Sequence, residues 1–495
     1  MTRHHGRFVG LNWGVVLPVM GGALVAVGAG MLVCGVAAAL YRDGVALAFF
    51  GPGLATLGGG AVALQAGRRR TTGVLRARDG FFAVSATWLV AAVLGALPFL
   101  LAGTFGNPID AFFESMSGIT GTGATVIGDV TGQAHAVLLW RSLSCWLGGV
   151  GIVILVVAIA PATGLATRVF AAESSGPSAD RLTPRVATTA KIIWSIYGTL
   201  TVVAAAAYAL AGMGPFDAVN HALATVATGG FSTRTESIGA FQSLAVELVA
   251  IVFMTLGGIN LAFYWRAIRG RSGIRPALAE VRAYFVLLLV GTVLVTGSLL
   301  LAGDARDLAT SLREASFAVV SVMTSTGYVT ADFDEWNNFA RLVIVALLFV
   351  GGCAGSTSGG MKVVRIMLLG KTAVQEVQRQ LQPKAMQVLR LPGRVFSEEA
   401  RRNVLGFFFI YVTVWVAGSL LMTALGLDLV TAATAAAAAL NVAGVGLGEV
   451  GAIENFSAVP PAGRAILGLL MLVGRLEVFT VLVLLTPAFW RREWT

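Results

Sequence analysis

Four stretches of the sequence share one pattern, and the first is DAFFESMSGITGTGAT at residues 110–125. The others are FDAVNHALATVATGGFS at 216–232, REASFAVVSVMTSTGYVT at 313–330 and TAATAAAAALNVAGVGLG at 431–448. Each is a short helix-compatible stretch that ends in small residues and glycine. Aligned on the glycine after that run, the four stretches share Gly123, Gly229, Gly327 and Gly444, at spacings of 106, 98 and 117 residues. The chain therefore contains a fourfold internal repeat.

Long apolar runs surround these stretches. Of the 495 residues, 56% are hydrophobic and only 12% are charged, whereas a soluble domain has about 25% charged residues. Since a helix needs about 20 apolar residues to cross the hydrocarbon layer, we predict ten full spans. They lie at about 12–38, 45–66, 81–102, 136–162, 190–212, 243–265, 283–302, 341–369, 404–425 and 464–487. The composition excludes a cytosolic enzyme, a disordered chain and a disulfide scaffold.

Four shorter segments remain between the spans, at about 109–119, 216–227, 313–324 and 428–440. Each is too short to cross a membrane, so we expect re-entrant helices. The predicted fold is an all-α integral membrane protein with an N-terminal helix pair and four pseudo-symmetric helix–pore loop–helix units around a central ion pore. The predicted parts are a two-helix domain at 1–67, pore units at 81–163, 187–268, 281–370 and 403–492, and a cytoplasmic segment at 371–402.

The loop charges predict the orientation. With the N-terminus in the cytoplasm, 27 of the 35 Lys and Arg residues fall in inner segments and six in outer ones. Positive charge favours the cytoplasmic side, so we expect both termini in the cytoplasm and all four short segments on the outer side. The net charge of +10 is then a consequence of topology rather than a sign of nucleic-acid binding.

The short segments predict an ion pore. Non-helical backbone at membrane depth is stable only where it lines water or is buried in protein. Carbonyl groups of four extended stretches around one axis can replace the hydration water of a cation, and glycine allows the conformations that hold such carbonyls in a row. The negative C-terminal ends of the short helices also favour a cation. The alternative is that these glycine-rich loops only turn the chain outside the membrane.

Residues 108–125, 216–233, 323–334 and 440–448 resemble the four filter loops of the TrkH type within the Trk/Ktr/HKT superfamily of potassium transporters. AESSGPSADRLTPR at 172–185, GGCAGSTSGGMKVVR at 351–365 and MLVGRLEVFTVLVLLTPAFWRR at 471–492 are similar to further parts of the TrkH pattern. The resemblance extends over nearly the whole chain, and the N-terminal helix pair fits TrkH rather than the shorter Ktr subunits. It implies potassium uptake in a bacterial inner membrane, a homodimer, and a cytosolic nucleotide-binding ring of the TrkA type. Potassium is then the transported ion, and we expect no organic cofactor on this chain.

The resemblance also implies a set of potassium-binding filter residues. They are Gly121, Thr122 and Gly123; Ala227, Thr228 and Gly229; Ser325, Thr326 and Gly327; and Val442, Ala443 and Gly444. Some plant relatives have serine at the first filter glycine and favour sodium, so Gly123 implies potassium. The chain departs from the family pattern at Gly121, where a hydroxyl residue is more frequent, and at Val445, where a proline is common.

The second helix of each unit contains a possible weak point. Glycine pairs favour a break in a helix, and they occur at 148–149, 257–258 and 351–352, with Gly474-Arg475 in the fourth unit. In the third unit the run rich in Gly, Ser and Thr continues to residue 360, which is unfavourable for a helix. We therefore predict an intramembrane loop at 351–360 below the filter.

Arg475 lies inside an apolar run, where an arginine is costly and usually has partners. A guanidinium has five donors, so carbonyl groups of the 351–360 loop are its expected acceptors. We expect these groups to form the closed gate, which consists of Gly351, Gly352, Gly355, Ser356, Thr357, Ser358, Gly359, Gly360 and Arg475. The alternative is that Arg475 extends to the cytoplasmic surface or pairs with Glu477.

Other charged residues have two interpretations each. Lys362 and Arg365 either couple the loop to a cytosolic partner or anchor the chain by charge, and segment 371–402 is long enough to be a docking surface. Outer acids such as Asp110 and Glu114 either concentrate cations near the mouth or are solvated helix caps.

Two rival functions need other residues. A proton- or sodium-coupled potassium symporter needs carboxylates or histidines on the path, and few acids apart from Glu247 and Glu477 lie within the spans. A lipid-modifying membrane enzyme needs a clustered nucleophile, an acid pair or a metal site, and we find none in the sequence. We therefore expect a transporter and not an enzyme.

Overall fold

The computed structural model describes residues 11–69, 77–159, 186–269, 274–302, 307–382, 389–392 and 394–490. Within these ranges the chain is helical apart from loops and one two-residue antiparallel pair, β1 (Arg390–Leu391) with β2 (Arg394–Val395). The predicted all-α class is therefore confirmed. The quoted stretch 172–185 lies outside the described residues.

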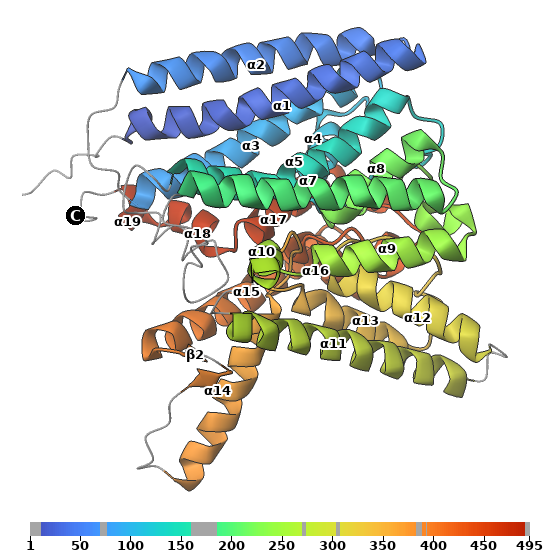
Figure 1. Ribbon diagram of the computed structural model, residues 1–495, viewed down its shortest axis with the longest axis vertical. Helices are drawn as coiled ribbons and strands as arrows, with labels where there is room; N and C mark the ends of the chain where they lie inside the picture. Colours follow the sequence, from blue (N-terminus) through green and yellow to red (C-terminus); the bar gives the residue numbers. More distant parts are fainter. Residues whose placement is uncertain are drawn as a thin grey trace, which may run out of the picture.

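The helices follow the chain as a pair and then four groups (Figure 1). The pair is α1 (Trp13–Tyr41) and α2 (Ala46–Arg68). The first two groups are α3 (Ala77–Leu101), α4 (Pro108–Thr120) and α5 (His135–Ile159), then α7 (Val186–Leu210), α8 (Pro215–Val226), α9 (Leu244–Gly257) and α10 (Leu261–Arg269). The third is α11 (Ile274–Leu301), α12 (Leu308–Met323), α13 (Asn338–Val350) and α14 (Val363–Leu381). The fourth is α15 (Glu398–Ala424), α16 (Leu429–Asn441), α17 (Pro461–Arg475), α18 (Phe479–Leu485) and α19 (Pro487–Trp490).

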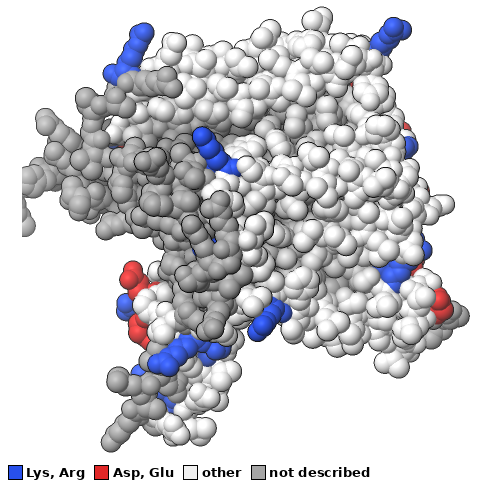
Figure 2. Space-filling view, viewed as in Figure 1, with Lys and Arg blue, Asp and Glu red and all other residues white. Residues whose placement is uncertain are grey.

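Most helices lie side by side, and the surface between their ends is largely uncharged. In the described part of the chain, six helices are long and apolar enough to cross a membrane, or up to eight if each bent pair counts as one span. Figure 2 shows charged side chains mostly toward two opposite edges of the visible face, with an uncharged band between them. This count is lower than the ten predicted spans, but it covers only the described residues and leaves out the 25-residue α5 at the predicted span 136–162. The predicted span 341–369 is interrupted, because α13 has only 13 residues and a loop separates it from α14.

Of the four short helices α4, α8, α12 and α16, all but α8 begin with a side-chain cap, and α8 begins after Gly214 without one. Asn107 accepts a hydrogen bond from the amide of Ile109, and Asp307 and Asp428 accept amides of the first turns of α12 and α16. Such caps satisfy amides that have no partner inside the helix. The cap at Asp307 also explains why α12 begins five residues before its predicted start at 313. Hydrogen bonding with Thr310 lowers the pKa of Asp307, so this cap stays ionised at neutral pH.

The second helices behave differently at their glycine pairs. The bend between α9 and α10 is 87°, and the bend between α17 and α18 is 117°. In the third group α13 ends at Val350 and the chain continues as a loop. The glycine pair 148–149 does not interrupt α5, so the predicted break is absent there.

The N-terminal pair α1 and α2 packs at small residues. A side chain at Gly28 would lie 2.6 Å from the amide nitrogen of Leu57 and 2.8 Å from the carbonyl oxygen of Gly53. Since small residues allow helices to approach closely within a bilayer, these contacts set the spacing of the pair.

We expect Gly28→Ala to lower thermal stability, because overpacking at such a contact costs about 1–3 kcal/mol. The measurement is thermal unfolding of the purified protein in detergent. Gly22→Ala is the matched control, since a side chain there meets nothing within 4 Å, and it should be neutral or stabilising. A Gly28→Ala protein as stable as the wild type would contradict close packing of the pair.

Candidate functional site: a ring of four loops

The four short helices end with the same hydrogen bond. The amides of Thr122, Gly229, Thr326 and Ala443 each donate to a carbonyl five residues earlier, at 2.8–2.9 Å. The residue just before each of these amides is left-handed: Gly121 has φ 76°, Thr228 51°, Ser325 56° and Val442 57°. The four stretches are therefore structural repeats, and the hydrogen bond at the end of each short helix shows which of their residues are equivalent.

The equivalence defined by the helix ends corrects the sequence alignment in the second stretch. The residues equivalent to Gly123, Gly327 and Gly444 lie two positions after the left-handed residue, and in the second stretch that is Gly230. Gly123, Gly230 and Gly327 also share a positive φ of 80°, 67° and 81°. The alignment on Gly229 is wrong by one residue, because the sequence offers two adjacent glycines and only the helix-end hydrogen bond distinguishes them. Ala227, with φ −75°, then belongs to the helix end.

The four glycines form a closed ring of backbone contacts. A side chain on Gly123 would collide with the carbonyl oxygen of Gly229, and one on Gly230 with that of Thr326. One on Gly327 would lie 2.9 Å from the amide nitrogen of Gly444, and one on Gly444 would lie 2.9 Å from the carbonyl oxygens of Thr122 and Gly123. Each stretch thus touches the next, and the fourth touches the first, so the four units meet in one ring of backbone contacts.

Three of the second helices approach the ring through a glycine. Side chains at Gly148, Gly257 and Gly474 would contact the carbonyl oxygens of Ile119, Val226 and Leu440, each near the end of the short helix of the same unit. Glycine at these positions therefore serves close packing, which explains why α5 continues through Gly148.

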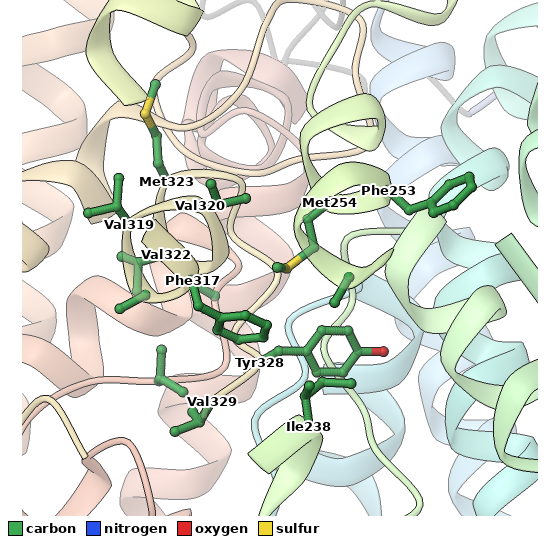
Figure 3. Packing of buried hydrophobic residues seen from close by; sticks show 14 of the residues in the cluster. Ile238, Phe253, Met254, Phe317, Val319, Val320, Val322, Met323, Tyr328 and Val329 are labelled. Atoms are coloured by element: carbon green, nitrogen blue, oxygen red, sulfur yellow. The ribbon is translucent and has the colours of Figure 1, made fainter. Parts of the chain in front are cut away.

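Tyr328 packs the third stretch against the second. It lies in the buried cluster drawn in Figure 3, with Ile238, Phe317 and Met254 nearby. Its carbonyl oxygen accepts a 2.6 Å hydrogen bond from the Ser321 hydroxyl. Aromatic packing and a local hydrogen bond thus stabilise the third loop.

The 351–360 stretch is a non-helical loop against the inner side of the ring, and neighbouring units satisfy its peptide groups. The amide of Cys353 donates to Gly258 at 2.8 Å, and that of Gly359 donates to the Ser325 hydroxyl at 2.6 Å. The amide of Gly360 donates to the carbonyl of Asn441 at 3.1 Å. The loop therefore has fixed contacts to the second, third and fourth units.

The rest of the loop is held in the same way. The carbonyls of Gly352 and Gly355 accept amides of Val363 and Leu261, the amide of Ser356 donates to Cys353, and the carbonyl of Ser358 accepts from the ammonium of Lys362. Gly351 has φ 76° and packs against Gly360. All predicted members of the loop thus lie in one compact turn between α13 and α14.

Arg475 connects this loop to the first unit. Its Nη1 donates to the carbonyl of Thr357 at 2.7 Å and its Nη2 to the carbonyl of Gly148 at 3.2 Å. The predicted contact with a loop carbonyl is therefore present. Arg475 is 7% exposed, so it does not extend to the surface. Glu477 forms a 2.7 Å ion pair with Arg365.

Glu114 is the site residue that sequence reasoning misjudged. Instead of a solvated cap it is fully buried, and its carboxylate is 2.8 Å from Nε of Arg141. The sequence feature that could have indicated a buried partner for Glu114 is Arg141, a charged residue inside the apolar run 136–162. Asp110 and Asp217 also have cationic partners, Arg464 at 2.6 Å and Arg234 at 2.8 Å, which offset their negative charge.

This geometry defines a class: a polytopic membrane protein in which four helix–short helix–helix units meet in a ring of backbone. The family model TrkH, described as a cation transport protein, matches residues 56–492. The chain therefore belongs to the TrkH family of cation transport proteins.

Individual relatives agree with this assignment. The Trk system potassium uptake protein TrkH of Halomonas elongata is 41% identical over 457 residues, covering 92% of this chain and 94% of that protein. The protein of the same name from Escherichia coli K12 is 39% identical over 465 residues, covering 93% and 96%. The crystal structure of the potassium transporter TrkH from Vibrio parahaemolyticus matches with a TM-score of 0.87 and 36% identity, covering 97% of this chain and all of that one. These names are those of transporters and not of enzymes.

The corrected alignment, with Gly230 in place of Gly229 in the ring, predicts different effects of substitutions at these two glycines. Gly230→Ala should abolish cation uptake or folding, because a side chain would meet the Thr326 carbonyl at a positive φ. Gly229→Ala should be rescued by Cys145→Gly, since the obstacle there is the Cys145 side chain at 2.7 Å. Rubidium uptake into proteoliposomes measures both. Rescue of Gly230→Ala, but not of Gly229→Ala, by Cys145→Gly would contradict the corrected alignment.

Proposed function

We propose that the chain takes up potassium through a channel-like pore whose selectivity filter is the ring of four loops. The filter consists of residues 121–123, 228–230, 325–327 and 442–444. The observation that carries the proposal is the closed ring of four glycine contacts, three of which include carbonyl oxygens of the neighbouring loop. Such oxygens suit a dehydrated monovalent cation, and the names of the relatives give potassium as the ion.

The gate of this pore is the loop at 351–360 together with Arg475. The loop lies against the inner ends of the short helices, and the Arg475 guanidinium binds it by a hydrogen bond to Thr357. A buried positive charge close to the path raises the barrier for a cation. Opening then requires that the loop leave its contacts with Ser325 and Asn441.

The remaining features of the proposal follow the resemblance. The chain acts as a homodimer in the bacterial inner membrane with both termini in the cytoplasm, and a TrkA-type nucleotide-binding ring regulates it. Residues 1–67 form a separate helix pair before the four pore units. Helix α14 extends away from the bundle at the lower left of Figure 1, which supports a docking role for the 371–402 segment.

Rubidium uptake by purified protein in proteoliposomes tests transport directly. Wild type should take up rubidium, with potassium competing more strongly than sodium. Gly123→Ser should reduce this preference by about tenfold, or ~1.4 kcal/mol, because its side chain would displace the Gly229 carbonyl. Gly128→Ser is the control, since it has open space. Uptake that requires an imposed proton or sodium gradient would instead support the symporter.

Arg475→Ala tests the gate. We expect basal rubidium uptake to rise about tenfold or more, because a hydrogen bond to a charged group contributes about 1.5–3 kcal/mol and the loss of the charge lowers the barrier. Arg379→Ala, at an exposed position on α14, should leave uptake unchanged. Unchanged basal uptake in folded Arg475→Ala would count against the gating role.

A further inference from the structure

We propose that Glu114 and Arg141 are a positioning pair that fixes the first filter loop against the second and thereby sets the preference for potassium over sodium. The inference rests on the proposed function. It concerns two side chains that lie behind the ring and do not contact the ion path themselves.

Arg141 binds the second loop. This side chain on α5 is 2% exposed, and its Nη1 donates to the carbonyl of Ser232 at 2.9 Å. Its guanidinium carbon lies 4.1 Å from the ring centre of Phe231. Phe231 and Ser232 directly follow Gly230, so one guanidinium contacts the backbone and the side chain next to a filter glycine.

Glu114 binds the first loop. Its carboxylate accepts the Nε hydrogen of Arg141 at 2.8 Å, the hydroxyl of Thr125 at 2.9 Å and the amide of Val126 at 3.1 Å. Thr125 and Val126 follow Gly123 by two and three residues. The carboxylate therefore joins the first loop to the arginine that holds the second, and it accepts all three hydrogen bonds at once.

The network exists in one quarter of the ring. The positions equivalent to Glu114, seven residues before the left-handed residue, are His221, Ala318 and Ala435. His221 lies 3.0 Å from the hydroxyl of Ser232 and so supports the second loop without a carboxylate. Only the first loop is thus fixed by a buried ion pair at this position.

Buried charge-assisted hydrogen bonds are short and directional, and a fully satisfied network in low dielectric favours one geometry. The discrimination between potassium and sodium depends on how the carbonyl oxygens are arranged. A pair that joins two neighbouring loops limits how far the carbonyl oxygens of these loops can move toward each other. Loss of the pair therefore allows the first and second loops to approach a smaller ion.

The test uses the full-length protein in proteoliposomes, with rubidium uptake measured against competing potassium or sodium. The variants are Glu114→Gln, Arg141→Lys, Thr125→Val, and Glu114→Gln combined with Arg141→Gln. The double variant leaves no unpaired charge buried, so it keeps the test valid if a single variant does not fold. Arg313→Gln is the control, because Arg313 pairs with buried Glu247 at 2.6 Å near the start of α12, twelve residues before the filter residue Ser325, although its own side chain is 45% exposed.

We expect the ratio of the half-inhibitory concentrations of sodium and potassium to fall about tenfold in Glu114→Gln and in the double variant, which corresponds to ~1.4 kcal/mol. Arg141→Lys and Thr125→Val should give smaller changes, and Arg313→Gln none. A purely structural role would lower the amount of folded protein and leave the ratio unchanged, within about twofold, and that result would overturn the inference. Absence of uptake by the wild type would instead overturn the proposed function.

Discussion

Peptide groups outside helices must find partners within the protein when no water is available, and this constraint shapes the centre of the molecule. The peptide groups of the loop at 351–360 find such partners through hydrogen bonds to Gly258, Ser325 and Asn441. Its shape therefore depends on the closed ring above it. The ring in turn depends on glycine, because each of its four contacts occupies the space of a side chain.

Much of this architecture could be predicted from the sequence because its signals are local. Apolar runs predict helices, and four short segments ending in glycine predict the repeat. Arg475 could be paired with the loop in advance, since a guanidinium in an apolar run requires acceptors, the 351–360 loop was predicted to be non-helical, and the resemblance points to the same contact. The hydrogen bond to Thr357 agrees with that argument.

The remaining features depend on contacts between segments distant in sequence. Gly229 and Gly230 cannot be distinguished by composition, because the register follows from a hydrogen bond at the helix end. The Gly148–Gly149 pair suggests a break, yet Gly148 packs against Ile119 within an intact helix. Glu114 and Arg141 are 27 residues apart, and only the packing of α4 against α5 brings them together.

The ring is also made from one polypeptide, and this has a consequence for how it can vary. In a ring built from identical chains, each codon change alters every subunit at once. Here Thr228, Ser325 and Val442 occupy equivalent left-handed positions with different side chains. A substitution in one loop can therefore adjust a single quadrant of the ring while its three neighbours keep their sequence.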